Sequence, residues 1–119
     1  MSCLFNSLQF FIPSLSSQEI RNRICDYLEE NGPVIEGVET SLLLSLDGAP
    51  VEYISNMREP STWGGAIEIQ AACNIWNICV TVQNRRGDEE SDIEFIPVVG
   101  GVERSVVLEW TGGHYEPVR

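Results

Sequence analysis

The sequence predicts an α+β fold in which N-terminal helices pack on a small, mostly antiparallel β-sheet. Apolar residues recur at helical spacing as far as Trp76, and beyond Asn77 the apolar period becomes two. Helical segments that precede strands, instead of alternating with them, are typical of this fold class. With 119 residues and 43% hydrophobic composition, the chain has enough apolar material for one domain over residues 1–119.

Residues 3–11 are predicted to form the first helix. Leu4, Leu8 and Phe11 are apolar at spacings of four and three, and Pro13 ends the run.

The second helix has a start signal and a stop signal. Ser16 precedes Glu19 by three residues, which is the spacing of a capping box, and residues 31–33 read Asn-Gly-Pro. The apolar stripe between them consists of Ile20, Ile24 and Leu28. The side expected to face solvent carries Arg21, Arg23, Glu29 and Glu30.

Three further helices are expected in the middle of the chain. Residues 40–46 are rich in leucine, and residues 50–57 begin with a proline, which suits the first turn of a helix. Residues 66–76 read AIEIQAACNIW, which is apolar on nearly every side, and a helix of that kind belongs in the interior.

The second half of the chain predicts strands. Ile78, Val80 and Val82 alternate with other residues, and the turn sequence NRRGDEESD separates this strand from a second one at 93–96. A third strand is expected at 105–110. It leads through a glycine pair to a short last strand that contains the chain's one histidine.

Charge and hydropathy exclude several classes of function. The formal net charge is −11, all seven basic residues are arginine, and phosphate binding needs a basic surface, so no nucleic-acid partner is expected. No stretch approaches the roughly 20 apolar residues that cross a bilayer, and no basic segment precedes the first apolar run. We therefore expect a cytoplasmic protein that has no membrane partner.

The four cysteines are not spaced as a metal site or a disulfide framework. The sequence has no CxxC, and Cys25, Cys73 and Cys79 fall in apolar periodic segments, where buried free thiols are common. We expect these three to be core residues, and we expect neither a bound metal nor a cofactor.

Cys3 differs because it stands at the start of a predicted helix. Free N–H groups and the helix dipole at that end favour a thiolate, and an imidazole near it can protonate a leaving amine. His114 is the available imidazole, and Glu116, two residues along a strand, shares its face and can orient it. The alternative is a buried cysteine and a surface histidine beside a glycine turn, and the residue types alone leave both open.

Three motifs, in this order, resemble those of the OTU (ovarian tumour) family of cysteine peptidases, most of which are deubiquitinases. "SCLF" around Cys3 matches the second half of the first motif, Asp-Gly-(Asn or Ser)-Cys-Leu-(Phe or Tyr). The last motif, a histidine followed by an aromatic residue and a polar one, matches His114, Tyr115 and Glu116. The middle motif is matched by Trp63, Gly64, Gly65 and Glu68.

The resemblance covers essentially the whole chain and implies a papain-like fold and a Cys-His-Glu triad. It makes Cys3 the nucleophile, His114 the general base and Glu116 the orienting group. The implied partner is ubiquitin or a ubiquitin-like protein, cut after its C-terminal glycine by a monomeric enzyme. Residues expected to contact the substrate are Gly112, Gly113, Trp63 and Tyr115.

Two departures from the family pattern keep other functions open. The Asp-Gly before the cysteine has no counterpart ahead of Ser2, and a glutamate replaces the usual aspartate or asparagine at 116. Either the printed sequence starts inside the motif or the oxyanion hole is shortened. One alternative function is a catalytically impaired ubiquitin-binding module. The other is a viral or transposon polyprotein-processing peptidase on the same fold.

Overall fold

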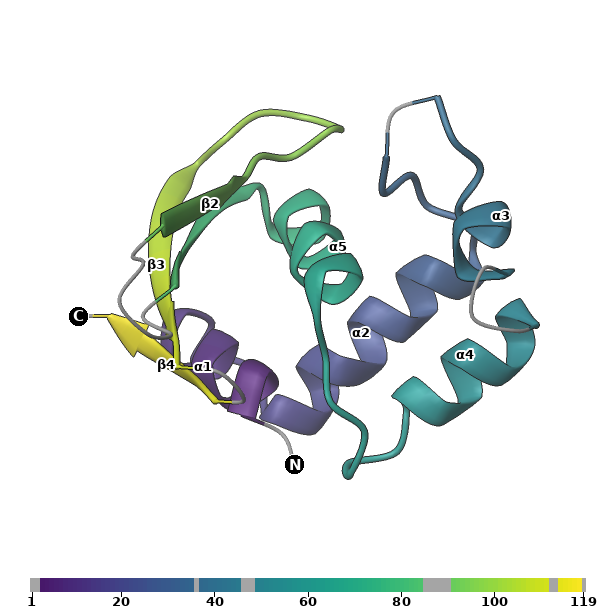
Figure 1. The fold of residues 1–119 in the computed structure, drawn as a ribbon, viewed down its shortest axis with the longest axis horizontal. Helices are drawn as coiled ribbons and strands as arrows, with labels where there is room; N and C mark the ends of the chain where they lie inside the picture. The colour runs from purple at the N-terminus through teal and green to yellow at the C-terminus, as the bar shows by residue number, and fades with distance from the viewer. Residues whose placement is uncertain (1–2, 36, 46–48, 85–90, 112–113, 119) are drawn as a thin grey trace.

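The computed structural model describes residues 3–35, 37–45, 49–84, 91–111 and 114–118. It has the predicted order of helices followed by strands (Figure 1). The helices are α1 (Cys3–Phe11), α2 (Ser17–Glu29), α3 (Thr40–Leu44), α4 (Pro50–Met57) and α5 (Ala66–Trp76). The strands are β1 (Ile78–Asn84), β2 (Ser91–Phe95), β3 (Arg104–Trp110) and β4 (Tyr115–Val118).

The helix boundary signals act as the sequence predicts. The Ser16 hydroxyl accepts a hydrogen bond from the Glu19 N–H at 3.1 Å, and the Glu19 carboxylate accepts one from the Ser16 N–H, which completes the capping box of α2. Pro50 occupies the first turn of α4, where its missing N–H costs no hydrogen bond.

The expectation that Arg21 faces solvent was wrong. Its side chain is 1% exposed, and the guanidinium donates to the carbonyls of Met57 at 2.7 Å and Pro60 at 3.2 Å. The guanidinium also stacks 4.1 Å from the ring centroid of Phe5, a residue of α1. The helical period alone placed Arg21 on the solvent side, and carbonyl acceptors at the end of α4 and in the loop after it allow the charge to be buried.

The four strands form one sheet in the order β2-β1-β3-β4. Two of the three neighbouring pairs, β1 with β2 and β3 with β4, are antiparallel, so the mostly antiparallel sheet is confirmed. The central pair, β1 with β3, is parallel. Alternation along a strand specifies which face is buried and carries no signal for the direction of its neighbour.

The core lies between the sheet and the helices, with α5 against the sheet and α2 beyond it (Figure 1). Six of the residues of α5 are buried: Glu68, Ile69, Ala71, Ala72, Cys73 and Asn74. Cys25 and Cys79 are also buried, as expected for core thiols.

Gly64 lets the loop before α5 pack tightly against α1. A Cβ atom at this position would lie 2.7 Å from Leu4 Cδ2 and 2.9 Å from Phe5 Cζ, closer than real contacts allow. The glycine of the middle motif thus supports the helix that carries Cys3.

Among the described residues, none of the helices is long and apolar enough to span a bilayer.

Candidate active site

Cys3 is the first residue of α1, and its side chain is half-buried. The N–H groups of a helix's first turn have no carbonyl partner within the helix, so they are available to an anion at this end.

His114 and Glu116 lie at the start of β4, on the edge of the sheet. The His114 carbonyl accepts a hydrogen bond from the Thr111 N–H at 3.1 Å, which closes the turn between β3 and β4. His114 Nε2 lies 3.2 Å from Glu116 Oε1, an ion-pair distance when the imidazole is protonated, and both side chains are more than half exposed. A carboxylate at Nε2 leaves Nδ1 free to face another group.

Residues near both ends of the sequence line one open cavity of about 320 Å³. Its walls come from α1 on one side and β4 on the other, and Figure 1 shows the two elements side by side. The lining residues are Cys3, Asn6, Ser7, His114, Tyr115, Glu116 and Pro117. The three expected triad residues and Tyr115 therefore share one cavity.

Three lining residues, Asn6, Ser7 and Pro117, were missed by the sequence reasoning. Asn6 and Ser7 stand three and four positions after Cys3, the spacing that puts residues on one helix face, and this was the available signal. Ser7 is 2% exposed, and its hydroxyl lies within hydrogen-bond distance of two main-chain carbonyls, one in α1 and one in β4.

Tyr115 turns its ring toward the interior, where it packs against Trp110 with ring centroids 6.5 Å apart. Burial raises the pKa of the Tyr115 phenol, and negative charge on Cys3 and Glu68 raises it further. The ring therefore lies within electrostatic reach of the site.

Trp63 does not line the Cys3 cavity. It is 51% exposed and borders a separate hollow of about 490 Å³, next to Tyr53, Met57 and the start of α5. Its expected contact with substrate stays a prediction. Gly112 and Gly113 lie outside the described residues.

The other thiols differ sharply from Cys3 in their surroundings. Burial raises the pKa of Cys25 to about 11 and that of Cys73 to about 12, and it raises the pKa of Cys79 as well. At neutral pH only a small fraction of each of these three thiols is ionised, so they are poor nucleophiles. Within the described ranges, no group of three or more histidine, cysteine or acidic side chains is arranged to hold a metal ion.

A helix-end cysteine that lines one cavity with a histidine-carboxylate pair is the side-chain set that cysteine peptidases use. The sequence model of the OTU-like cysteine protease family matches residues 2–115. The chain belongs to this family.

Individual relatives agree with the family match. Over 95 residues the chain is 33% identical to ubiquitin thioesterase otu2 of Schizosaccharomyces pombe, a match that covers 72% of this chain and 30% of that protein. The chain thus spans about a third of the length of this curated relative.

Solved structures share the fold. The viral OTU domain protease from Dera Ghazi Khan virus superposes with a TM-score of 0.74 at 22% identity, covering 98% of this chain and 72% of that one. An OTU domain solved in complex with ubiquitin also gives 0.74, at 20% identity, covering 98% of this chain and 62% of that one. At these identities the likeness shows the fold alone, which is that of OTU domains.

Proposed function

We propose that residues 1–119 form one catalytic domain that hydrolyses peptide or isopeptide bonds after the C-terminal glycine of ubiquitin or a ubiquitin-like protein. One observation carries the proposal. Cys3 at a helix start and the His114–Glu116 pair at a strand start line the same open cavity. Family membership, a thioesterase relative and a ubiquitin-bound neighbour of the same fold support this substrate.

In the first half-reaction, the Cys3 thiolate attacks the carbonyl carbon of the terminal glycine and forms a tetrahedral intermediate. The main-chain N–H of Cys3, which has no intrahelical partner at this position, donates to the oxyanion. The His114 imidazolium then gives its proton to the leaving amine, and the C–N bond breaks to leave a thioester on Cys3.

In the second half-reaction, neutral His114 takes a proton from a water molecule, and the water oxygen attacks the thioester carbonyl. The C–S bond breaks, which releases the ubiquitin C-terminus as a carboxylic acid and restores the thiolate beside protonated His114. The acid then loses its remaining proton to solvent. Glu116 at Nε2 stabilises the imidazolium and keeps Nδ1 directed at Cys3.

The test is covalent capture by ubiquitin that carries an electrophile at its C-terminus. We expect a single adduct, located at Cys3 by peptide mapping. Cys3→Ala should abolish the adduct, whereas alanine at Cys25, Cys73 or Cys79 should leave it unchanged, because those thiols are buried.

Two other outcomes would replace the proposal. Tight binding of ubiquitin without an adduct would indicate a catalytically impaired binding module. Neither binding nor adduct would indicate a polyprotein-processing peptidase or a ubiquitin-like partner other than ubiquitin.

A further inference from the structure

Ser7 joins the helix that carries Cys3 to the strand that carries His114. Its hydroxyl oxygen lies 2.8 Å from the Cys3 carbonyl oxygen and 3.0 Å from the Tyr115 carbonyl oxygen. A hydroxyl has one hydrogen, so these two acceptors share it. The Ser7 side chain is buried, at 2% exposure, and a buried hydroxyl needs such partners.

The strand geometry explains why the Tyr115 carbonyl needs a donor from α1. Thr111 and His114 form a hydrogen-bonded antiparallel pair, since the Thr111 N–H donates to the His114 carbonyl. Such pairs alternate with non-hydrogen-bonded ones, and the next pair is Trp110 with Tyr115. The Tyr115 carbonyl therefore points away from β3, toward the open edge of the sheet, where α1 lies (Figure 1).

A proline at position 117 is compatible with this open edge of the sheet. Pro117 also belongs to a non-hydrogen-bonded pair, opposite Leu108, so its missing N–H would face the edge and β3 loses no hydrogen bond. On this edge of β4, the Ser7 hydroxyl donates a hydrogen bond from α1 to the strand.

We propose that Ser7 is a positioning residue for the reaction, and the proposal rests on the function proposed above. Tyr115 stands between His114 and Glu116, so the bond from Ser7 fixes the backbone of the imidazole-carboxylate pair. Its other contact is the carbonyl of the nucleophile itself, one helical turn back. Ser7 thus sets the distance and direction from the thiolate to the imidazole without touching the substrate.

The principal variant is Ser7→Ala, which keeps the helix and removes both contacts. With ubiquitin bearing a fluorogenic amide at its terminal glycine, we expect kcat to fall about 10- to 100-fold while KM stays within about twofold, since a misplacement near 1 Å costs up to about 10² in rate. Ser7→Thr keeps the hydroxyl and should recover most of kcat.

The second readout needs no ubiquitin. The alkylation rate of Cys3 by chloroacetamide, followed by peptide mapping against pH, reports how readily the thiolate forms beside His114. We expect Ser7→Ala to move this pH profile toward alkaline pH, in the same direction as His114→Ala and by a smaller amount.

Ser16→Ala is the matched control, because it also removes one serine hydroxyl and lowers stability through loss of the α2 cap, at a residue that does not line the cavity. All assays are run well below the melting temperature of the least stable variant. If Ser7→Ala loses melting temperature as Ser16→Ala does but keeps the wild-type kcat and pH profile, the positioning role is refuted.

Failure of the proposed function would look different. In that case Cys3 of the wild type would alkylate with the profile of an ordinary thiol, and His114→Ala would not change it. A wild-type profile that depends on His114 but not on Ser7 would refute the positioning role alone.

Discussion

Glu116 and Glu68 are carboxylates of two motifs, and they lie in opposite surroundings. Glu116 is 63% exposed at the side chain, on the sheet edge, with its oxygen 3.2 Å from the His114 imidazole. Glu68 is 1% exposed, in the first turn of α5, where it accepts hydrogen bonds from the Tyr53 hydroxyl and the Gly65 N–H, both at 2.7 Å.

The difference indicates that one acidic residue of the family motifs suits a chemical role and the other a structural role. A carboxylate in water can accompany an imidazole through charged and neutral states at small cost, whereas a buried carboxylate is confined by its donors. Glu68 joins α4 to the start of α5, close to the loop that packs on α1. The acidic residue of the middle motif thus supports the helix that begins with Cys3, and that of the last motif pairs with the proposed base.

The largest expected effect is the loss of turnover when the exposed His114–Glu116 pair is changed. His114→Ala should lower kcat by about 10⁴–10⁶, and Glu116→Gln by less, about 10²–10⁴, since the orienting member of a triad is the most dispensable. Steady-state kinetics with the fluorogenic ubiquitin substrate measures both. Melting temperatures should match the wild type because both side chains are exposed. Equal losses from both variants would show that Glu116 does more than orient the ring.

Changes at the buried Glu68 should lower the stability of the fold. Glu68→Ala removes the buried carboxylate that accepts from the Tyr53 hydroxyl and the Gly65 N–H, and it should lower the free energy of unfolding by about 3 kcal/mol, measured by urea denaturation. Glu94→Ala, an exposed carboxylate on β2, is the control and should cost less than about 0.5 kcal/mol. A Glu68→Ala protein as stable as this control would show that Glu68 is not an anchor.

Glu68→Gln sharpens the same test through pH. Burial raises the pKa of Glu68 above its ordinary value, and the bonds from Tyr53 and Gly65 offset part of the rise. A raised pKa means that folding favours the protonated form. The stability from this group is therefore complete below pH 4.5 and is lost as pH rises through the folded pKa. Relative to Glu68→Gln, the wild type should become less stable as pH increases; the opposite trend would mean that the buried carboxylate is stabilised.

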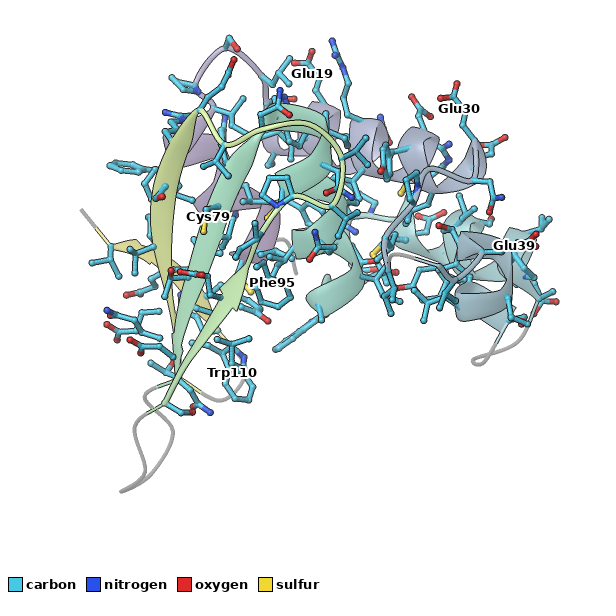
Figure 2. The ribbon with its side chains drawn as sticks, turned by 90° about the horizontal axis from the view of Figure 1, so that it is seen from above. Glu19, Glu30, Glu39, Cys79, Phe95 and Trp110 are labelled. Atoms are coloured by element: carbon cyan, nitrogen blue, oxygen red, sulfur yellow. The ribbon has the colours of Figure 1, made fainter. Side chains whose placement is uncertain are left out.

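The smallest expected effect comes from the exposed carboxylates as a whole. The net charge is −11, and Figure 2 shows Glu19, Glu30 and Glu39 on the outside of the helical half. If this surface steers ubiquitin, kcat/KM should fall several-fold as added salt shortens the Debye length from about 30 Å at 0.01 M to about 8 Å at 0.15 M. Alkylation by uncharged chloroacetamide is the control and should not change. If kcat/KM does not change with salt concentration, the negative charge does not steer ubiquitin and serves solubility.

Local signals in the sequence predicted most of the elements. The capping box at Ser16, the prolines at 13 and 50 and the period change at Asn77 each act within a few residues. Helices begin just after Ser16 and at Pro50, and others end just before Pro13 and Asn77. Asn77 also ends α5 with a positive φ of 55°, the left-handed conformation of many helix ends.

What the sequence could not supply depends on contacts between distant segments. The buried charge of Arg21 needs carbonyls from the end of α4 and the loop after it, and the role of Glu68 needs a hydroxyl from Tyr53. Ser7 reads as an ordinary helical serine until β4 is placed beside α1. The parallel direction of β3 beside β1 likewise cannot be predicted from the alternation of apolar and polar residues along the strands.

The candidate base and the candidate nucleophile lie at opposite ends of the chain, which has a single histidine. A ribosome adds about 5–20 residues per second, so on the order of ten seconds separate the synthesis of Cys3 from that of His114. In the proposed mechanism, the thiol gains the His114 imidazole only after β4 has emerged and paired with β3. Translation would then delay the onset of catalysis, and a polypeptide that stops short of β4 would carry Cys3 without this base.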